Sequence, residues 1–439
     1  MSQKNKHLVV VSIDAMVTRD LEYAKTLPNF KRILDGASVI RNVRTIYPTL
    51  THPVHATLIS GAPAGKTGVY NNIVYDPEHP EANVVWLNDL AQVKCDTLIH
   101  AAKREGLSVA TSTWPMTTYG SEFIDYLIPN AFDFYFDGMQ DRPLDAYRAL
   151  GAGENVIDFI AYAVEKCGFK DVHPEVDFFQ FYCMQGIVKN YKPNLLLMHP
   201  GNVDAARHKY GVFGEHVFEA LREVDDMLGM LLGALEDAGI LENTDIVLLS
   251  DHGQIGVTRN VSPNVYLRDA GFIDLDENGK VKDWLAFTKN AGGSAHVYLK
   301  NPDDKVTYEA VYKLLSDMAE AGMYGFEKVY TLAEVEQKYG LSGAFSFVLE
   351  TDGYTRFAEN ICGKAVEGFE YGDYSTGKGT HGYEPFKGPQ PVFVAKGPSF
   401  KSGVVIPEGD ILNHAPTLAK VLGVEICDSE GHAVLELLN

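Results

Sequence analysis

Short apolar runs that alternate with helical patterns constrain the fold of this chain most. The runs are rich in β-branched residues and lie at His7–Ile13, Leu107–Thr111, Asn194–Met198, Asp245–Leu249 and Pro391–Ala395. Helical patterns separate them, such as the stripe of apolar residues from Val217 to Leu235, whose polar face with Asp225 and Asp226 should be solvated. This alternation predicts an α/β fold with a mostly parallel central sheet flanked by helices. Ligands of such sheets bind at the carboxyl ends of the strands.

Two stretches interrupt the alternation and suggest a core with inserted cap segments. We predict a metal-binding catalytic core of residues 1–115, 190–261 and 375–439. The first insertion, residues 116–189, is rich in aromatic side chains, notably at 132–136 and 178–182. The second, residues 262–374, carries strand and helix signals of its own, at Ala295–Leu299 and Tyr308–Ala321. The insertions either wall a substrate pocket or are ordinary peripheral structure, and the second either forms a separate lobe or does not.

Charge and cysteine content limit the classes of partner. The 439 residues include 38 Lys and Arg against 59 Asp and Glu, a net charge of -21. Such a field repels nucleic acid polymers and anionic membranes, so a phosphorylated substrate needs local cations such as metal ions. No apolar run reaches the length of a membrane span, and no leader-like segment is evident. The five scattered cysteines suit reduced thiols, so we expect a cytoplasmic protein.

Candidate metal ligands occur where the predicted strands end. Asp14 closes the first run, Asp204 and His208 follow the third at a spacing of one helical turn, and Asp251 and His252 follow the fourth. His381 lies in a glycine-rich loop before the last run. Carboxylates and imidazoles together suit zinc, with manganese or cobalt as substitutes. Six such ligands are enough for two ions that each keep an open position.

A threonine stands at the start of a predicted helix near these ligands. Thr51 follows an extended run, Val39–Ile46, and precedes the helical stretch His52–Ser60, which places it at or near the N-cap. Its hydroxyl should lie at the positive end of the helix dipole. A capping threonine is ordinarily structural, but one beside two metal ions is a candidate nucleophile. His52 and His55 follow it, and the sequence leaves open whether one acts as a general acid or both have packing roles.

These motifs resemble those of the alkaline phosphatase superfamily and, within it, the nucleotide pyrophosphatase/phosphodiesterase family. The matching pieces run in family order over nearly the whole chain: Val11–Ala15, Tyr47–Pro53, Thr57–Gly61, Thr67–Asn72, Asp204–His208, Ser250–Gly253, Gly379–Tyr383 and Asn413–Leu418. The resemblance implies a two-zinc phosphohydrolase with a covalent phosphothreonine intermediate on Thr51. It implies one zinc held by Asp204, His208 and His381. It implies that Asp14, Asp251 and His252 hold the second zinc, with Thr51 on that ion. Asn72 and the backbone N–H of Thr51 would hold a phosphoryl oxygen.

Departures from the family pattern bear on the substrate. His52 stands where the family usually has a phenylalanine that stacks on a nucleobase, and Val54 stands where it usually has asparagine. The family's Ser-Ser-Gly is Ala205-Ala206-Arg207 here. We expect Arg207 to be a solvated helix residue rather than a phosphate ligand.

A small phosphodiester or nucleotide is therefore the expected substrate, with base identity of little importance. A phosphonate hydrolase or a phosphomonoesterase of the same superfamily is the alternative. A catalytically inactive binding protein is disfavoured, because such a protein has no reason to keep Thr51 alongside all six ligands. The oligomeric state is left open by the sequence.

Overall fold

The computed structural model describes residues 6–82, 85–131, 141–369 and 378–439. Its centre is an eight-stranded sheet in the order β20-β2-β19-β7-β1-β6-β4-β5. In chain order these strands are β1 (His7–Ser12), β2 (Ser38–Ile40), β4 (Val109–Ser112), β5 (Tyr126–Ile128), β6 (Leu195–Met198), β7 (Thr244–Leu249), β19 (Phe393–Lys396) and β20 (Val405–Ile406). All pairings in the sheet are parallel except those of β19 with β7 and β2. The predicted α/β fold is thus confirmed, and all five predicted strands are present.

The central strands of this sheet are buried on both faces. Every residue of β1 is buried, and Val9 pairs with Leu196 of β6 on one side and Ile246 of β7 on the other. A continuous apolar run is what a parallel strand needs when helices cover both faces. This explains why the strands appear in the sequence as unbroken runs rather than as alternating patterns.

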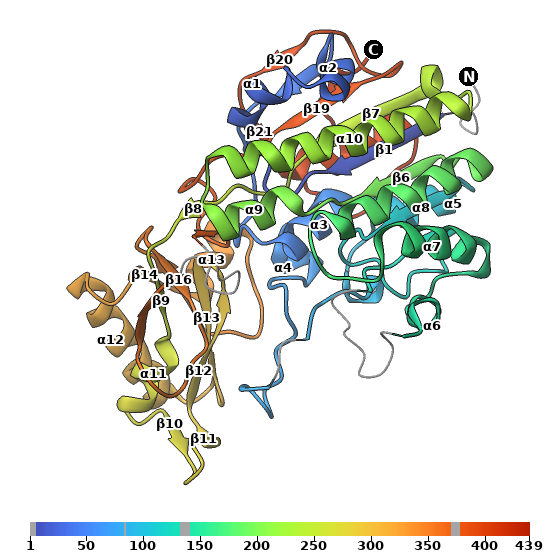
Figure 1. Ribbon diagram of the computed structural model, residues 1–439. Coiled ribbons are helices and arrows are strands. Elements are labelled where there is room, and N and C mark those ends of the chain that lie inside the picture. The colour runs from blue at the N-terminus through green and yellow to red at the C-terminus, as the bar shows by residue number, and fades with distance from the viewer. Residues whose placement is uncertain (1–5, 83–84, 132–140, 370–377) are drawn as a thin grey trace.

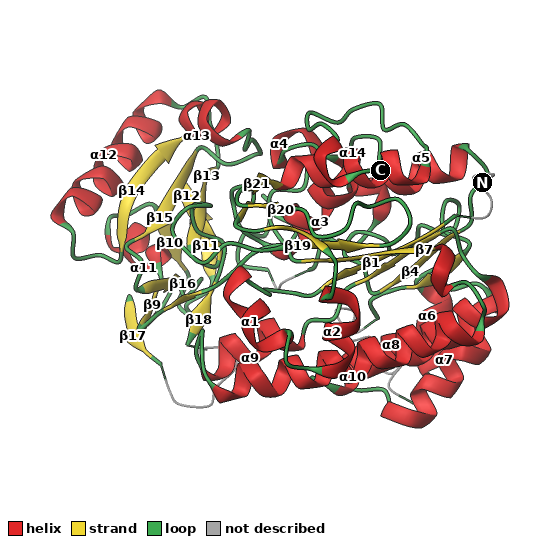
Figure 2. Ribbon diagram, turned by 90° about the horizontal axis from the view of Figure 1, so that it is seen from above, coloured by secondary structure: helices red, strands yellow, loops and turns green. Residues whose placement is uncertain are grey.

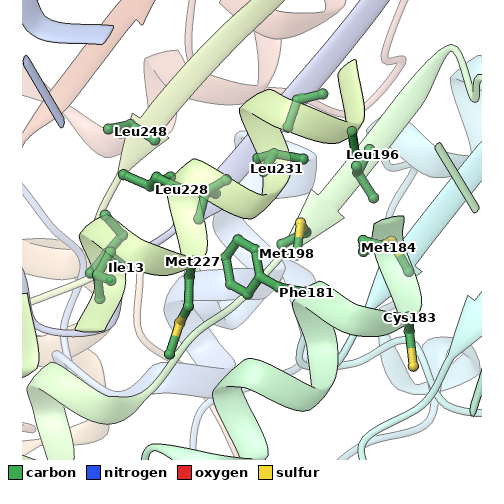
Figure 3. Close-up of a cluster of buried hydrophobic side chains, with 14 of the residues drawn as sticks. Ile13, Phe181, Cys183, Met184, Leu196, Met198, Met227, Leu228, Leu231 and Leu248 are labelled. Atoms are coloured by element: carbon green, nitrogen blue, oxygen red, sulfur yellow. The ribbon is translucent and has the colours of Figure 1, made fainter. Parts of the chain in front are cut away.

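Helices cover both faces of the sheet (Figure 2). One layer contains α1 (Leu21–Ala24), α2 (Pro28–Leu34), α7 (Glu154–Cys167), α8 (Glu175–Tyr191), α9 (Asn202–Tyr210) and α10 (Glu215–Asp237). The opposite layer contains α3 (Thr51–Ser60), α4 (Ala64–Thr67), α5 (Leu98–Arg104) and α14 (His414–Leu422). Figure 3 shows the first layer's core, where Leu228 and Leu231 of α10 and Phe181 of α8 pack toward Met198 of β6.

The polar face of α10 is only partly solvated. Asp226 is exposed as expected, but Asp225 is buried. The Asp225 carboxylate accepts hydrogen bonds from the backbone N–H groups of Asn29, at 2.9 Å, and Phe30, at 2.6 Å. These N–H groups open helix α2 and have no partner within it, so Asp225 satisfies them from another element. The expectation for Asp225 was wrong because a helix start from elsewhere in the chain packs on it.

A second, four-stranded antiparallel sheet lies beside the main one (Figure 1). Its order is β12-β13-β15-β14, with β12 (Ala286–Ala291), β13 (Ser294–Leu299), β14 (Phe326–Thr331) and β15 (Phe347–Thr351). Helix α12 (Lys305–Ala321) packs on it, and the group has its own apolar cluster around Phe287, Leu315 and Phe347. We call this group the lobe. The predicted strand at Ala295–Leu299 and helix at Tyr308–Ala321 are both present in it.

Smaller elements complete the described chain. They are β3 (Val43–Arg44), α6 (Pro143–Ala149), β8 (Ile255–Gly256), β9 (Arg259–Val261), α11 (Pro263–Asp269), β10 (Ile273–Leu275), β11 (Val281–Trp284), α13 (Leu332–Tyr339), β16 (Thr355–Phe357), β17 (Val366–Gly368), β18 (Gly379–Thr380) and β21 (Gly409–Asp410). None of the described helices has the length and apolar composition that crossing a membrane requires.

The aromatic residues of the first insertion fall into two groups. Those at 132–136 lie outside the described residues. Phe179 and Phe181 of α8 are buried in the main core. The division of the chain into a core and two insertions stays a prediction.

Candidate metal centre and nucleophile

The predicted ligands converge at the carboxyl edge of the main sheet. Strands β6, β1 and β7 are neighbours and parallel, so their ends meet at one edge. Asp14 follows β1, helix α9 with Asp204 and His208 follows β6, and Asp251 and His252 follow β7. His381 comes to the same edge directly after β18. Residues from four distant segments thus form one site.

Asp204, His208 and His381 form the first cluster. The Asp204 carboxylate lies 3.2 Å from His208 Nε2 and 3.9 Å from His381 Nε2. His208 Nδ1 donates to the carbonyl of Gly379 at 2.8 Å, and His381 Nδ1 donates to the carbonyl of Thr49 at 2.9 Å. These bonds hold both rings with Nε2 turned toward the carboxylate, which is how backbone carbonyls orient metal-binding histidines.

The second cluster surrounds His252. Its Nε2 lies 3.2 Å from Asp251 Oδ2 and 3.6 Å from Asp14 Oδ1. Ligand atoms of Asp14, Asp204 and His252 all lie within 4.8 Å of one another, so Asp204 borders both clusters. The structure brings all six predicted ligands together. Their assignment to two separate ions stays a prediction.

Burial dominates the electrostatics of the clusters. It raises the pKa of Asp14, and the neighbouring Asp251 and Asp204 carboxylates raise it further. Burial lowers the pKa of His252 and of His381 to about 3. The imidazoles are therefore neutral near pH 7, which is the state that binds a metal ion.

Several buried atoms of the clusters lack hydrogen-bond partners among the described residues. They include Asp14 Oδ1 and Asp251 Oδ2. A buried polar atom without a partner costs about 1–3 kcal/mol. Divalent cations would bind these atoms and neutralise the negative charge of the three neighbouring carboxylates. The residues therefore fit one or two metal ions, and the mixture of carboxylates and imidazoles suits zinc.

Thr51 and Asn72 lie beside the second cluster. Thr51 is the first residue of α3, with Leu50 as the N-cap, and its Oγ1 lies 3.4 Å from His252 Nε2. The Asn72 Oδ1 accepts the backbone N–H of His52 at 2.9 Å, which holds the Asn72 side chain near the helix start and leaves its amide N–H groups as donors. Asn72 and Thr51 line the same cavity.

That cavity has a volume of about 430 Å³. Its wall combines the metal-site residues with segments that the sequence did not single out, and includes Asp14, Thr51, His52, Asn72, Trp86, Thr113, Pro115, Asn130, Asp171, His173, Val176, Asp177, Gln180, His199, Gly201, Asp204, His208 and His381. Neither lysine nor arginine occurs among these described lining residues.

His199 is a member of the site that the sequence analysis missed. Its Nε2 lies 3.3 Å from Asp14 Oδ2, and its Nδ1 donates to the carbonyl of Ser12 at 3.1 Å. The sequence contained a signal for it, because His199 directly follows β6 just as Asp251 follows the end of β7.

The two histidines after Thr51 differ in position. His55 is fully buried: its Nδ1 donates to the Thr51 carbonyl at 2.7 Å and its Nε2 accepts from Ser12 Oγ at 2.9 Å. This arrangement favours the packing role for His55. His52 lines the cavity, with its ring centroid 5.2 Å from that of Trp86.

The prediction that Arg207 is a solvated helix residue is wrong. Arg207 is fully buried, and its guanidinium lies 2.6 Å from the carboxylate of Asp20. Arg207 Nε also donates to the carbonyl of Ala15 at 3.2 Å. The expectation was wrong because this side of α9 packs on the segment after β1, where an acidic partner is buried with it. Arg207 supports the backbone next to Asp14 rather than facing the cavity.

The lobe holds the loop that carries His381. The backbone N–H of Gly293 donates to the His381 carbonyl at 2.6 Å, and Ser294 Oγ donates to the Gly382 carbonyl at 2.6 Å. The N–H of Gly382 in turn donates to Thr49 Oγ1 at 2.7 Å. The lobe, the His381 loop and the segment before Thr51 are therefore linked by hydrogen bonds.

The chain is similar to known phosphodiesterases over most of its length. The sequence profile of the type I phosphodiesterase / nucleotide pyrophosphatase family matches residues 8–384. A venom phosphodiesterase of Naja atra is 24% identical over 90% of this chain and 41% of its own length. Ectonucleotide pyrophosphatase/phosphodiesterase 1 of Saccharomyces cerevisiae is 24% identical over 82% of this chain and 48% of its own length. The chain thus spans less than half the length of these relatives.

A solved structure shares the fold. Murine ectonucleotide pyrophosphatase/phosphodiesterase 5 has a TM-score of 0.65 and 20% identity, with 99% of this chain and 100% of that chain covered. A second structure of the same mouse protein is an inactive threonine-to-alanine variant in complex with AMP. With the family profile matching most of its residues, this chain belongs to the type I phosphodiesterase / nucleotide pyrophosphatase family.

Proposed function

We propose that this protein is a metal-dependent phosphodiester hydrolase in which Thr51 is the nucleophile. The observation that carries the proposal is the position of Thr51 Oγ1 at the start of α3, 3.4 Å from His252, on the wall of a cavity that also exposes Asp204, His208 and His381. The inactive threonine-to-alanine variant of the mouse relative, bound to AMP, supports both the nucleophile and a nucleotide as substrate.

Each residue has a role in this proposal. Thr51 Oγ1 attacks phosphorus and forms a phosphothreonine while the leaving group departs, and water then hydrolyses that ester. The Asn72 amide and the Thr51 backbone N–H donate to a non-bridging phosphoryl oxygen, where negative charge accumulates. When bound, two divalent cations would lower the pKa of the Thr51 hydroxyl and stabilise the leaving oxygen.

We propose two zinc ions as the cofactors, held by the two clusters, with manganese or cobalt as substitutes. The buried oxygens Asp14 Oδ1 and Asp251 Oδ2, which accept no hydrogen bond from the described residues, support this. Asp251→Asn and His381→Ala should each lower bound zinc by about one equivalent, and the double variant should lose more. Elemental analysis of dialysed protein measures this, and an unchanged zinc content in either single variant would remove that residue from the site.

A diester is the favoured substrate class because of the charge in the cavity. A phosphate monoester carries nearly two negative charges near neutral pH and a diester carries one. The described lining residues offer Asn72 as a neutral donor and contain no lysine or arginine. We expect kcat/KM for p-nitrophenyl thymidine monophosphate to exceed that for p-nitrophenyl phosphate at least about tenfold, or about 1.4 kcal/mol. A preference for the monoester, or for a phosphonate over both, would support the alternative phosphomonoesterase or phosphonate hydrolase.

We also propose a cytoplasmic location. All five cysteines are free thiols, and Cys362 and Cys427 are exposed. Exposed thiols persist in reducing compartments. Fractionation of cells that produce the protein should recover it with the cytoplasmic proteins, and recovery from the medium would refute this assignment.

A further inference from the structure

An acid–histidine pair forms part of the cavity wall outside the metal clusters. His173 lies just before α8, and Asp177 lies in the first turn of that helix. His173 Nδ1 donates to Asp177 Oδ2 at 2.5 Å. The Asp177 side chain is fully buried, whereas that of His173 is 32% exposed. One edge of the imidazole therefore faces the carboxylate, and Nε2 on the opposite edge makes no hydrogen bond to the described residues.

The pair is fixed to the segment that carries the first metal cluster. Asp177 Oδ1 also accepts the backbone N–H of Gly201, the residue that precedes α9, at 2.6 Å. The His173 ring packs on the same glycine, since a Cβ placed on Gly201 would lie 3.1 Å from His173 Cε1. His173 therefore lies on the side of the cavity where α9 presents Asp204 and His208.

That side is where the leaving group departs in the proposed reaction. Thr51 lies against His252 of the second cluster, so the first cluster would face the opposite side of a phosphorus atom that Thr51 attacks. Two-metal sites place one ion at the attacking oxygen and the other at the leaving oxygen. Substituents of the leaving oxygen would then extend past Asp204 toward His173.

His173 is also a source of positive charge in the cavity wall. Burial lowers the pKa of His52 to about 4 and that of His381 to about 3. Burial acts in the same direction on His173, but the charge and hydrogen bond of Asp177 outweigh it and raise the pKa to about 9. Asp171 is a second carboxylate on the same wall, and its charge also raises the pKa of His173.

We propose that His173, oriented by Asp177, is a substrate-binding residue that donates a hydrogen bond from Nε2 to an anionic oxygen of the leaving group. The inference rests on the proposed phosphodiesterase function and narrows it. Among the substrates of this family, His173 would favour those whose leaving group is itself a phosphate over those with an uncharged leaving group. Charge-assisted hydrogen bonds to phosphate are stronger than neutral ones, so the contact discriminates against leaving groups that lack the charge.

The test compares two substrates in one variant. ATP has a pyrophosphate leaving group, whereas p-nitrophenyl thymidine monophosphate has an aryl one. In His173→Gln, the ratio of kcat/KM for ATP to that for the aryl ester should fall at least about tenfold, the scale of one charge-assisted hydrogen bond. Asp177→Asn should lower the ratio in the same direction. The matched control is His216→Gln, because His216 Nδ1 also pairs with an acid, Glu219, at 3.0 Å but does not line this cavity.

Equilibrium binding separates this inference from the proposed function. Calorimetry of zinc-loaded protein would compare AMP with α,β-methylene-ADP. The second ligand carries a terminal phosphonate group, joined through a methylene, that AMP lacks. His173→Gln should weaken α,β-methylene-ADP at least about fivefold more than AMP, because only the former reaches the imidazole. Equal weakening of both ligands, or none, would overturn the role of His173. If the parent turned over neither substrate, the proposed function would be overturned. The relative loss of affinity for α,β-methylene-ADP and AMP in His173→Gln would still test the role of His173.

Discussion

At the scale of single residues, the site depends on side chains whose surroundings determine their state. His252 and His381 are neutral because they are buried, and Asp14 and Asp251 each keep an oxygen that accepts no hydrogen bond from the described residues. Arg207 supports the site from outside the cavity, because it donates to the Ala15 carbonyl beside Asp14 and neutralises the charge of Asp20. A residue that does not touch the cavity thus helps to fix a predicted ligand.

Replacing Arg207 tests that support. Arg207→Leu leaves the buried carboxylate of Asp20 without its partner, so we expect a loss of about 3–5 kcal/mol in the free energy of unfolding. Arg222→Leu is the control, since Arg222 pairs with Glu215 where both side chains are exposed, and its loss should stay below about 1 kcal/mol. Urea unfolding of both variants measures the difference. Similar losses in the two variants would show that Arg207 is not buried with its partner as described.

At the scale of elements, the sequence predicts those helices and strands that follow from local patterns of residues. The buried strands and the long helices follow from apolar runs and helical spacing, and the ends of the strands pointed to Asp14, Asp204 and Asp251. Contacts between distant segments were not predictable in this way. Asp225 looked solvated because its partners, the N–H groups at the start of α2, lie far away in the chain. The His173–Asp177 pair was missed because its place in the cavity wall depends on the contact with Gly201, which is distant in the sequence.

The hairpin between β12 and β13 gives an element-scale prediction. Gly292 has a φ of +71°, and a Cβ there would lie 2.2 Å from the His381 carbonyl oxygen. Gly292→Ala should displace the His381 loop, lowering both zinc content and kcat, the latter at least about tenfold, because small misplacements in an active site are costly. Gly322→Ala is the matched control: its φ is +66°, but nothing lies within 4 Å of the added atom.

The control variant should therefore lose only about 1 kcal/mol of stability to backbone strain and keep its zinc and its turnover. Elemental analysis and steady-state kinetics on both variants make the comparison. If Gly292→Ala retains full zinc and full kcat, the lobe does not position His381.

At the scale of the whole molecule, buried histidines outside the site link stability to pH. His296 of β13 and His414 of α14 are buried, and neither ring nitrogen has a hydrogen-bond partner among the described residues. Burial lowers the pKa of each to about 3. In the unfolded chain a histidine titrates near pH 6.5, at about its reference pKa. Between these values the unfolded state binds the proton and the folded state does not.

Stability should consequently be intact above about pH 6.5 and fall as the pH drops toward 3, by about 1.4 kcal/mol per pH unit for each histidine. His296 lies beside Phe345 and His414 beside Phe393, two members of the same apolar cluster. His296→Phe and His414→Phe should each reduce the loss of stability between pH 7 and pH 5, as measured by urea unfolding. His216→Phe, at an exposed position, should leave the loss unchanged. If neither His296→Phe nor His414→Phe reduces the parent's loss of unfolding free energy between pH 7 and pH 5, this account is contradicted.

The central claim, that Thr51 attacks the substrate, is tested most directly by replacing it while monitoring the metal. Turnover of p-nitrophenyl thymidine monophosphate and zinc content should be measured on the same samples of the parent, Thr51→Ala and Thr51→Ser. The account predicts that Thr51→Ala keeps its zinc and its fold but loses at least about a thousandfold in kcat, whereas Thr51→Ser retains measurable activity. A zinc-loaded Thr51→Ala protein that hydrolyses the diester at a rate close to the parent's would contradict it, because water would then be the direct nucleophile.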